Sequence, residues 1–375
     1  MAELLIHTDR IIGNIEKINA LMKKHNSEWT LISKVLSGHK ESLRNILAHP
    51  SIKEVHSVGD SRLSSLEVIK SLRPDIVTMY IKPVPQNLVP SIVQLADISL
   101  ISSMRTLELM NDAAARSGVV HRVIVMIELG ELREGIVREN IVDFYSRAFA
   151  MENIDVIGLG SNLGCMYGIE PTYDKMIQLS LYRQILEQMF DRKVPIISGG
   201  SSITLPLVGS KRLPPTMNHY RIGEAVFLGT SPLDNKRFRN LSTEVFEYQA
   251  NILELEEKQT KPDGIISEAA VGHVAEAETQ PRSDDTHCRA LMDFGLLDVD
   301  VDDVVPKDNN VRFAGTTSDM TVFELGDNKD EKGKLRYHVG DTVRFKPSYM
   351  GAARLMSSKF IYKTVRGKSH QLPLV

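Results

Sequence analysis

The stretch ADISLISSMRTLELMNDAAARSGVVHRVIVMIELG, residues 96–130, shows the pattern that decides the fold. It begins with a short apolar run, ADISLIS, and ends with a second one, RVIVMIELG, and both are rich in Ile and Val. Between them, residues 102–117 have the apolar spacing of a helix. A strand, a helix and a second strand in this order predict one repeat of a β-α fold.

The same alternation extends in both directions, from Trp29 to Gly229. Further helical patterns cover residues 40–48, 61–72 and 171–190. Roughly eight β-α units close a parallel barrel, whereas a doubly wound sheet normally uses fewer. We therefore predict an α/β fold with a (β/α)8 barrel of the TIM type. Its strands are expected in WTLISKVL, EVHSVGD, DIVTMYIK, ADISLIS, RVIVMIELG, IDVIGLGS, VPIISGG and RIGEAVFLG.

After about Pro232 the sequence changes to strand-like pieces separated by polar, acidic or glycine-containing turns. We predict a barrel domain over residues 1–232 and a C-terminal, mainly-β domain over residues 233–375. The acidic stretches DVDVDD and GDNKDEKGK match no calcium-loop spacing and are interpreted as solvated loops. The pieces expected to form strands are FEYQANILELEE, CRALMDFGLLDVDV, VRFAGTTSDMTVFEL and DTVRFKP.

Length and composition limit the class of protein. The 375 residues are 42% hydrophobic and 25% charged, which is enough apolar material for globular domains and excludes extensive disorder. The net charge of −3 gives no field that would favour binding to nucleic acid or to an anionic membrane surface. No apolar run approaches about 18 residues, no signal peptide is visible, and two cysteines make no disulfide framework. A cytoplasmic protein is expected.

Reactive groups of a parallel barrel lie where its strands end, which draws attention to Lys34 in ISKVL. Apolar residues flank it on both sides, and a desolvated lysine has a lowered pKa and can form an imine with a carbonyl compound. The alternative is a lysine at a strand end whose ammonium group reaches water.

Two glycine-containing turns late in the barrel could bind an anion. They are SGGSSITL, residues 198–205, and RIGEAVFLG, residues 221–229. Backbone N–H groups can approach an oxyanion closely at glycines, and the last two barrel strands often carry a phosphate site. Gly199, Gly200, Ser202 and Gly223 fit that role, although a tight turn with a helix cap explains the first segment equally well.

Other polar residues at strand ends are weaker candidates. Arg133 could donate to a phenolate or carboxylate, or pair with a neighbouring glutamate, Glu128, Glu131 or Glu134. Asn162 and Cys165 follow another strand, and Thr317, Ser318 and Asp319 lie in the β region. No zinc, serine-hydrolase or dinucleotide-binding motif is present, so no metal site is predicted. The eleven histidines are scattered along the chain, among them His7, His39, His56, His121, His219, His287 and His338.

Taken in order, these motifs resemble the fold-type III pyridoxal-phosphate enzymes, and most closely the ornithine racemase branch of the alanine racemase superfamily. The resemblance covers nearly the whole chain. It rests on IHTDRIIGNIEKI, SKV, GDSRL, ELGELREGI, GSNLGC, SGGSSITL, HYRIGEAVFLG, GTTSD and SYMGAARLM.

The resemblance implies roles for several residues around pyridoxal 5′-phosphate. Lys34 matches the lysine that holds the cofactor as an internal aldimine and acts as a base on one face of Cα, and Arg133 matches the arginine near the phenolic oxygen. Arg221 matches the arginine on the pyridine nitrogen. Because a guanidinium does not give its proton to the ring, that nitrogen stays unprotonated, which favours racemisation. The groups implied around the phosphate are Gly200, Ser202, Gly223 and Tyr349.

Two departures from the alanine racemase pattern leave the second proton donor open. Asn162 stands where those enzymes have a histidine over the ring, and Leu296 stands where they have the tyrosine base. The candidates are Cys165, ranked first because a thiol near a cationic group can be activated, then Ser318 and His287.

Ser318 and Asp319 bear on the substrate. Related diamino-acid decarboxylases bind a distal ammonium group with a T-C-D motif that reaches the partner subunit's site, and T-S-D occupies that place here. The resemblance therefore implies a racemase of ornithine, lysine or arginine that works as a homodimer with shared active sites. A turn role for Asp319, a decarboxylase of basic amino acids and a non-catalytic cofactor-binding protein remain alternatives.

Overall fold

The computed structural model describes residues 1–210, 212–259, 262–265, 267, 272–275 and 286–367. Its described residues form two compact units. One unit is Thr8–Thr243, and the other combines Met1–His7 with Glu244–Gly367.

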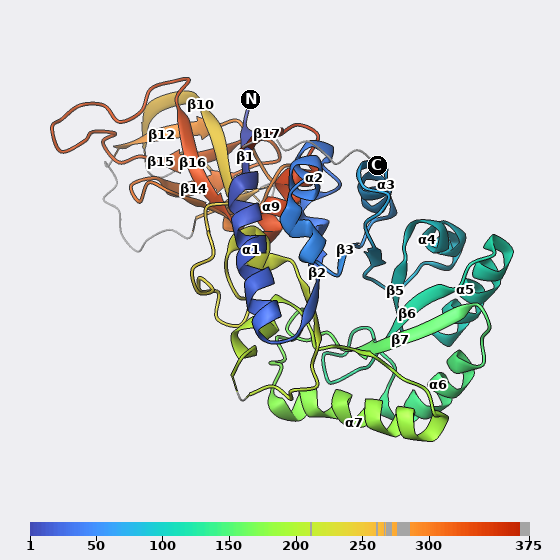
Figure 1. The fold of residues 1–375 in the computed structure, drawn as a ribbon. Coiled ribbons are helices and arrows are strands. Elements are labelled where there is room, and N and C mark those ends of the chain that lie inside the picture. Colours follow the sequence, from blue (N-terminus) through green and yellow to red (C-terminus); the bar gives the residue numbers. More distant parts are fainter. Residues whose placement is uncertain (211, 260–261, 266, 268–271, 276–285, 368–375) are drawn as a thin grey trace. The chain divides into compact units, whose positions relative to one another are not determined.

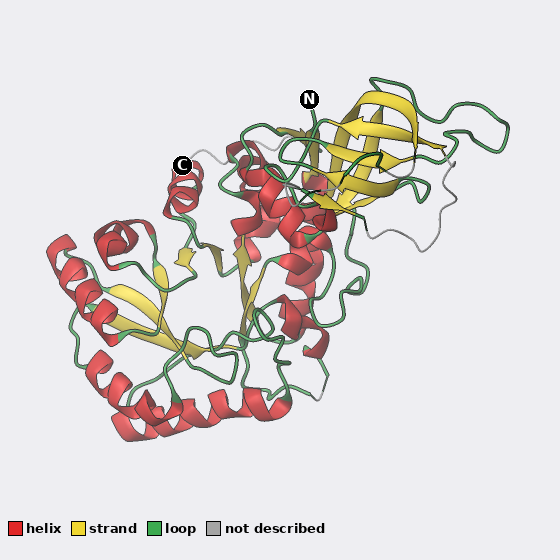
Figure 2. Cartoon of the chain, turned by 180° about the vertical axis from the view of Figure 1, so that it is seen from behind, coloured by secondary structure: helices red, strands yellow, loops and turns green. Residues whose placement is uncertain are grey.

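The first unit is a closed barrel of eight parallel strands, β2 to β9. Each of the eight apolar runs overlaps one of these strands, so the predicted barrel is confirmed. Figure 2 shows the helices of this unit, in red, outside its strands, in yellow. The strands are β2 (Glu28–Ile32), β3 (Ser57–Asp60), β4 (Thr78–Tyr80), β5 (Ile98–Ile101), β6 (His121–Met126), β7 (Ile154–Gly160), β8 (Ile196–Ser198) and β9 (His219–Ile222).

The stretch that decides the fold forms β5, α5 and β6 as expected (Figure 1). Helix α5 begins after Ser103, whose side chain accepts a hydrogen bond from Thr106 N, and it ends at Gly118, which has φ +66°. The helices of the barrel unit are α1 (Thr8–Lys24), α2 (Lys40–Leu47), α3 (Leu63–Leu72), α4 (Val89–Leu95), α5 (Met104–Ser117), α6 (Ile141–Phe149), α7 (Tyr173–Phe190) and α8 (Glu224–Leu228).

Apolar side chains from the barrel strands form a buried cluster. Burial of one such side chain contributes about 1.5–3 kcal/mol to the free energy of folding. The cluster therefore stabilises the association of short strands, which have little stability alone. It consists of Met79, Ile98, Leu100, Ile124, Met126 and Ile196.

The second unit contains a nine-stranded sheet, as expected for a mainly-β domain. Tyr248, Phe294, Phe323 and Phe345 are fully buried and in mutual ring contact at its core. The elements are β1 (Glu3–His7), β10 (Phe246–Gln259), β11 (His273–Val274), β12 (Thr286–Met292), β13 (Val304–Pro306), β14 (Arg312–Thr316), β15 (Thr321–Glu324), β16 (Thr342–Pro347), α9 (Tyr349–Ser357) and β17 (Tyr362–Arg366).

The first residues of the chain belong to this sheet. Strand β1 pairs antiparallel with β10 and parallel with β17. The boundary between the two compact units lies between Thr243 and Glu244, whereas the sequence analysis predicted it after residue 232. The sequence analysis also assigned the N-terminal residues to the barrel, whereas Met1–His7 belong to the β unit. Within the parts of the chain that the structure describes, no helix is long and apolar enough to cross a membrane.

Candidate active site

Lys34 lies directly after the first barrel strand. Strand β2 ends at Ile32, and Lys34 begins a short 3-10 helix, Lys34–Leu36. Its side chain is exposed in the described chain, so the expectation of a desolvated lysine is wrong, and the alternative of an ammonium group that reaches water applies. The preceding residue, Ser33, is buried and donates its hydroxyl to Asp60 Oδ2 at 2.9 Å. The backbone next to Lys34 is therefore held in place, while the Lys34 side chain remains accessible.

Strands β2 and β9 pair in parallel, with Leu31 opposite Ile222, so the segments that follow them are neighbours at the rim. Glu224, the first residue of α8, lies beside Lys34. Burial raises the pKa of Glu224, and the Lys34 ammonium group partly offsets this effect. Glu224 at the start of α8 and Arg221 on β9 therefore occupy different elements, and their roles are distinct.

Arg221 lies on β9 and is 5% exposed. Its Nη1 donates to Ser198 Oγ, and its Nη2 donates to the carbonyl oxygen of Ser161 at 2.7 Å. Burial lowers the pKa of Arg221 to about 10, against the opposing effect of Glu134. The guanidinium therefore keeps its charge at neutral pH.

The two glycine-containing turns come together through Ser202. Its buried hydroxyl accepts hydrogen bonds from the backbone N–H of Gly223, at 3.3 Å, and of Ala225, at 3.1 Å. Gly200 has φ +109°, and a Cβ there would lie 2.5 Å from Thr204 Oγ1. The backbone at this turn therefore requires glycine.

Arg133 pairs with Glu134, as the ion-pair alternative stated. Its Nε and Nη2 both contact the Glu134 carboxylate, and 34% of the Arg133 side chain is exposed. Asn162 Nδ2 donates to the same carboxylate at 3.2 Å. Arg133 and Asn162, which follow two different strands, therefore both contact Glu134. The role of Arg133 near a cofactor oxygen stays a prediction.

Cys165 is exposed, with its sulfur 4.0 Å from Asn162 Oδ1, and is therefore no buried hydrophobe. Its thiol interacts electrostatically with Arg133 and Arg221, whose pKa values it raises against the effect of burial. Cys165 thus lies near positive charge, although its role as proton donor stays a prediction.

Sequence reasoning missed the main role of Glu131, which is only 1% exposed. Its carboxylate accepts hydrogen bonds from five backbone N–H groups, and these bonds outweigh the effect of burial and lower its pKa to about 2. No local signal predicts this role, because the donors lie more than thirty residues further along the chain. The donors are Gly164, Cys165, Met166, Tyr167 and Ile169.

The remaining predicted residues belong to the β unit. Tyr349 begins α9. Ser318 donates to Asp319, which is exposed on the turn between β14 and β15, as the turn alternative stated. His287 Nδ1 lies 3.2 Å from Glu324 Oε2, and Leu296 donates its backbone N–H to Thr317. The proposed roles of Tyr349, Ser318 and Asp319 are not tested by this arrangement.

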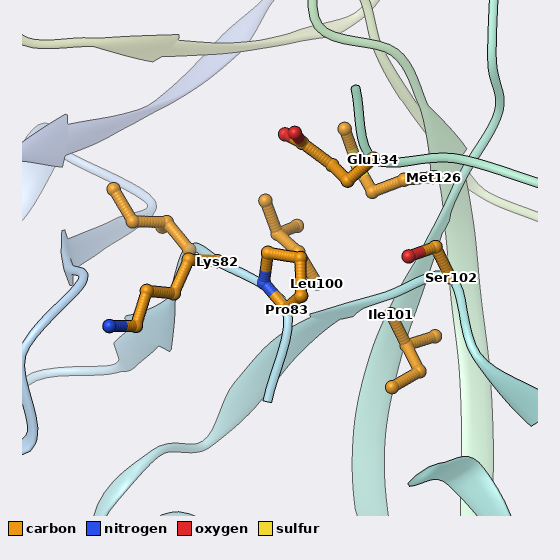
Figure 3. A pocket seen from close by; sticks show the side chains of 8 residues that line it. Lys82, Pro83, Leu100, Ile101, Ser102, Met126 and Glu134 are labelled. Atoms are coloured by element: carbon orange, nitrogen blue, oxygen red, sulfur yellow. The ribbon is translucent and has the colours of Figure 1, made fainter. Parts of the chain in front are cut away.

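A small pocket opens at the rim near the ends of β4, β5 and β6 (Figure 3). Its polar lining includes Lys82, Ser102 and Glu134, the last of which also contacts Arg133 and Asn162. The pocket therefore adjoins the cluster around Glu134. Its apolar lining is Ile81, Pro83, Leu100, Ile101 and Met126.

The residues present fit a phosphate-bearing cofactor with a carbonyl group and a ring nitrogen. The Ser202 hydroxyl, whose oxygen accepts from the N–H groups of Gly223 and Ala225, has its own proton to donate to a phosphate, Lys34 supplies an accessible amine, and Arg221 supplies a buried donor. In addition, the Ser161 hydroxyl is buried without a partner among the described residues. No group of three or more potential metal ligands occurs in the described ranges.

Comparison with known proteins places the chain in a family. Residues 6–231 match the family model of the alanine racemase N-terminal domain, and the chain belongs to this family. The predicted relationship to the alanine racemase superfamily and the prediction of an amino-acid racemase are thereby confirmed at the level of the family.

Two curated relatives match over nearly their whole length. An ornithine racemase of Acetoanaerobium sticklandii is 28% identical over 96% of this chain and 98% of its own. A lysine racemase of Thermotoga maritima is 26% identical over 96% of this chain and 97% of its own.

Two solved structures share the fold. An alanine racemase of Corynebacterium glutamicum has a TM-score of 0.69 at 14% identity and covers 97% of this chain and 99% of its own. A D-threonine aldolase of Filomicrobium marinum has the same TM-score at 15% identity, over 99% of this chain and 93% of its own. At these identities the likeness concerns the fold alone.

Proposed function

We propose that this protein is a pyridoxal-phosphate-dependent racemase of a basic amino acid, with ornithine preferred and lysine or arginine next. The observation that carries the proposal is the arrangement at one barrel rim. There, Lys34 follows the first barrel strand, the buried Arg221 lies on the last, and the Ser202 hydroxyl meets the Gly223 N–H group. The family and the two curated relatives support the reaction class.

Pyridoxal phosphate, when bound, supplies the electron delocalisation that makes the Cα proton removable. Ser202 and the N–H groups of Gly223 and Ala225 would hold its phosphate, together with Gly200 and Tyr349. Lys34 would hold the cofactor covalently and move the proton on one face of Cα. Arg133 would lie at the phenolic oxygen, and Asn162 would lie over the ring.

Arg221 sets the chemistry at the ring nitrogen. The charged guanidinium, anchored on both terminal nitrogens, would donate to that nitrogen without transferring a proton. Arg221 would in this way keep the ring nitrogen unprotonated, so that return of the Cα proton competes better with side reactions. This feature favours racemisation over decarboxylation.

Cys165 is our candidate for the proton donor on the opposite face. Its exposed thiol lies near the guanidinium groups of Arg133 and Arg221 and carries a proton that it can donate. Proton removal by Lys34 and return from Cys165 would invert the configuration at Cα.

The substrate class rests on Ser318 and Asp319. A carboxylate that faces the distal ammonium of ornithine makes a charge-assisted hydrogen bond that alanine cannot make. Because Asp319 is exposed in its own chain, it is available to a second subunit. We accordingly propose a homodimer in which each chain supplies Asp319 to its partner's site, and a cytoplasmic location stays a prediction.

The test incubates purified protein with L-ornithine, L-lysine, L-arginine, L-alanine and L-serine, with and without added pyridoxal phosphate, and separates the products by chiral chromatography. D-ornithine should form fastest, the Lys34→Ala variant should form none, and Lys40→Ala, a change at another exposed lysine, should retain activity. Release of carbon dioxide from L-ornithine without D-ornithine would identify a decarboxylase instead. Cofactor binding without either product would identify a non-catalytic binding protein.

A further inference from the structure

The barrel interior contains a line of polar side chains to which the proposed function gives no role. All of them except the half-buried His56 are buried, where a polar group is costly unless it is hydrogen-bonded. Each of them is bonded to the next. We call this set the histidine relay and define it as Ser198, His219, Thr30, Ser57 and His56.

The relay begins at Arg221. A guanidinium can only donate, so the Ser198 oxygen accepts from Arg221 Nη1. The Ser198 hydroxyl keeps its own proton, and His219 Nδ1 lies 2.9 Å from the oxygen, within reach of that proton. In the tautomer of His219 that carries its proton on Nε2, Nδ1 accepts from Ser198.

In that tautomer the remaining bonds can be donated in the same direction. His219 Nε2 lies 3.0 Å from Thr30 Oγ1, and the Thr30 oxygen lies 2.7 Å from Ser57 Oγ. Ser57 Oγ in turn lies 3.1 Å from His56 Nδ1. His56 Nε2 lies 3.9 Å from the exposed Glu28 carboxylate, an ion-pair contact that is too long for a hydrogen bond.

This direction requires a neutral His219. A protonated imidazole carries a hydrogen on both ring nitrogens, so it could not accept from the Ser198 hydroxyl. Burial, and then the neighbouring His56 and Arg221, lower the pKa of His219 well below its ordinary value. The rings of His56 and His219 are in edge contact at 5.1 Å, which leaves little freedom to turn. The imidazole is thus a fixed acceptor for Ser198.

We propose that His219 is a positioning residue that, acting through Ser198, holds the guanidinium of Arg221 in place at the active site. The significance of this position for the reaction rests on the proposed function, because it assumes that Arg221 contacts the cofactor. The hydrogen-bond geometry itself does not depend on a cofactor.

The first experiment uses cofactor-free protein labelled with nitrogen-15 in histidine and arginine. NMR at neutral pH should find His219 as the neutral Nε2–H tautomer, and the Arg221 guanidinium should rotate slowly. The His219→Leu variant, which has no acceptor, should show faster guanidinium rotation. His219→Asn, whose amide oxygen can replace Nδ1, should restore slow rotation. An Nδ1–H tautomer, or unchanged rotation in His219→Leu, would overturn the proposal.

The second experiment measures the dissociation constant for pyridoxal phosphate by absorbance titration. His219→Leu should weaken binding about tenfold, as expected when a bond to a charged group is misplaced, and His219→Asn should stay within about threefold of wild type. Thr30→Val, which changes only the next link, is the matched control and should also stay within about threefold. Equal binding by folded His219→Leu and wild type would contradict the positioning role. Failure of wild type to bind the cofactor would instead contradict the proposed function and leave the NMR result to decide on the relay.

Discussion

Glu131→Gln is the substitution for which the structure gives the clearest magnitude. The Glu131 carboxylate accepts five backbone N–H groups from residues 164–169 and is almost completely buried. Its pKa of about 2, against an ordinary value of 4.5, corresponds to about 3 kcal/mol of stabilisation of the charged form. Gln has one oxygen instead of two and directs its amide hydrogens at N–H donors. We expect the variant to lose about 2–3 kcal/mol of unfolding free energy.

The pH dependence has a definite sign. The pKa of Glu131 is lower in the folded chain than its ordinary value, so its contribution is complete above pH 4.5 and is lost as the pH falls towards 2. The difference in stability between wild type and Glu131→Gln should therefore shrink as the solution is acidified. A midpoint difference of roughly 3–6 °C is expected at neutral pH.

The assay is thermal unfolding followed by circular dichroism, in a series from about pH 7 down to about pH 3.5. The matched control is Glu139→Gln, which changes an exposed glutamate close by in the sequence and should unfold like wild type. If Glu131→Gln and Glu139→Gln unfold at the same temperature at neutral pH, the stabilising role of the carboxylate is refuted. A difference that grows on acidification would refute the sign of the linkage.

Three further predictions concern the reaction. Asp319→Asn should lower kcat/KM for ornithine about tenfold or more and leave any alanine turnover nearly unchanged, as measured by chiral chromatography; equal losses for both substrates would point to a structural role. Arg221→Gln should slow racemisation and weaken cofactor binding, as measured by polarimetry and absorbance titration, and an unchanged rate would exclude the guanidinium from the site. Cys165→Ala should slow racemisation by about a hundredfold or more while exchange of the Cα proton of one enantiomer with deuterated water continues, and wild-type racemisation would assign the second proton donor elsewhere.

The barrel could be predicted because each strand is a short apolar run and each helix has its own period. The signal is local, so all eight barrel strands overlap the expected runs, although β9 begins two residues before its run and α8 occupies most of the rest of it. Strand β1 was not predicted, because its partners β10 and β17 lie more than two hundred residues further along the chain. A strand of five residues carries no periodicity that reveals such partners.

Placement of the candidate site followed from the rule that parallel strands end at one rim. This rule located Lys34, Ser202 and Arg221 correctly with respect to the strands. It could not predict how far Lys34 is exposed, because exposure depends on the path of the chain after β2.

Contacts between distant residues explain what else was missed. His56 and His219 are far apart in the sequence and were counted as scattered, yet their rings touch inside the barrel. In the sequence, Glu131 is one of several glutamates around Arg133, whereas its hydrogen-bond donors lie in a later loop. A single sequence carries no signal for such pairs.

The central claim is that the ε-amine of Lys34 binds pyridoxal phosphate covalently. Holoprotein reduced with borohydride, digested and mapped by mass spectrometry tests it most directly. The account predicts a phosphopyridoxyl adduct on the peptide that contains Lys34 and on no other peptide. An adduct at a different lysine, or none in protein that has bound the cofactor, would contradict it.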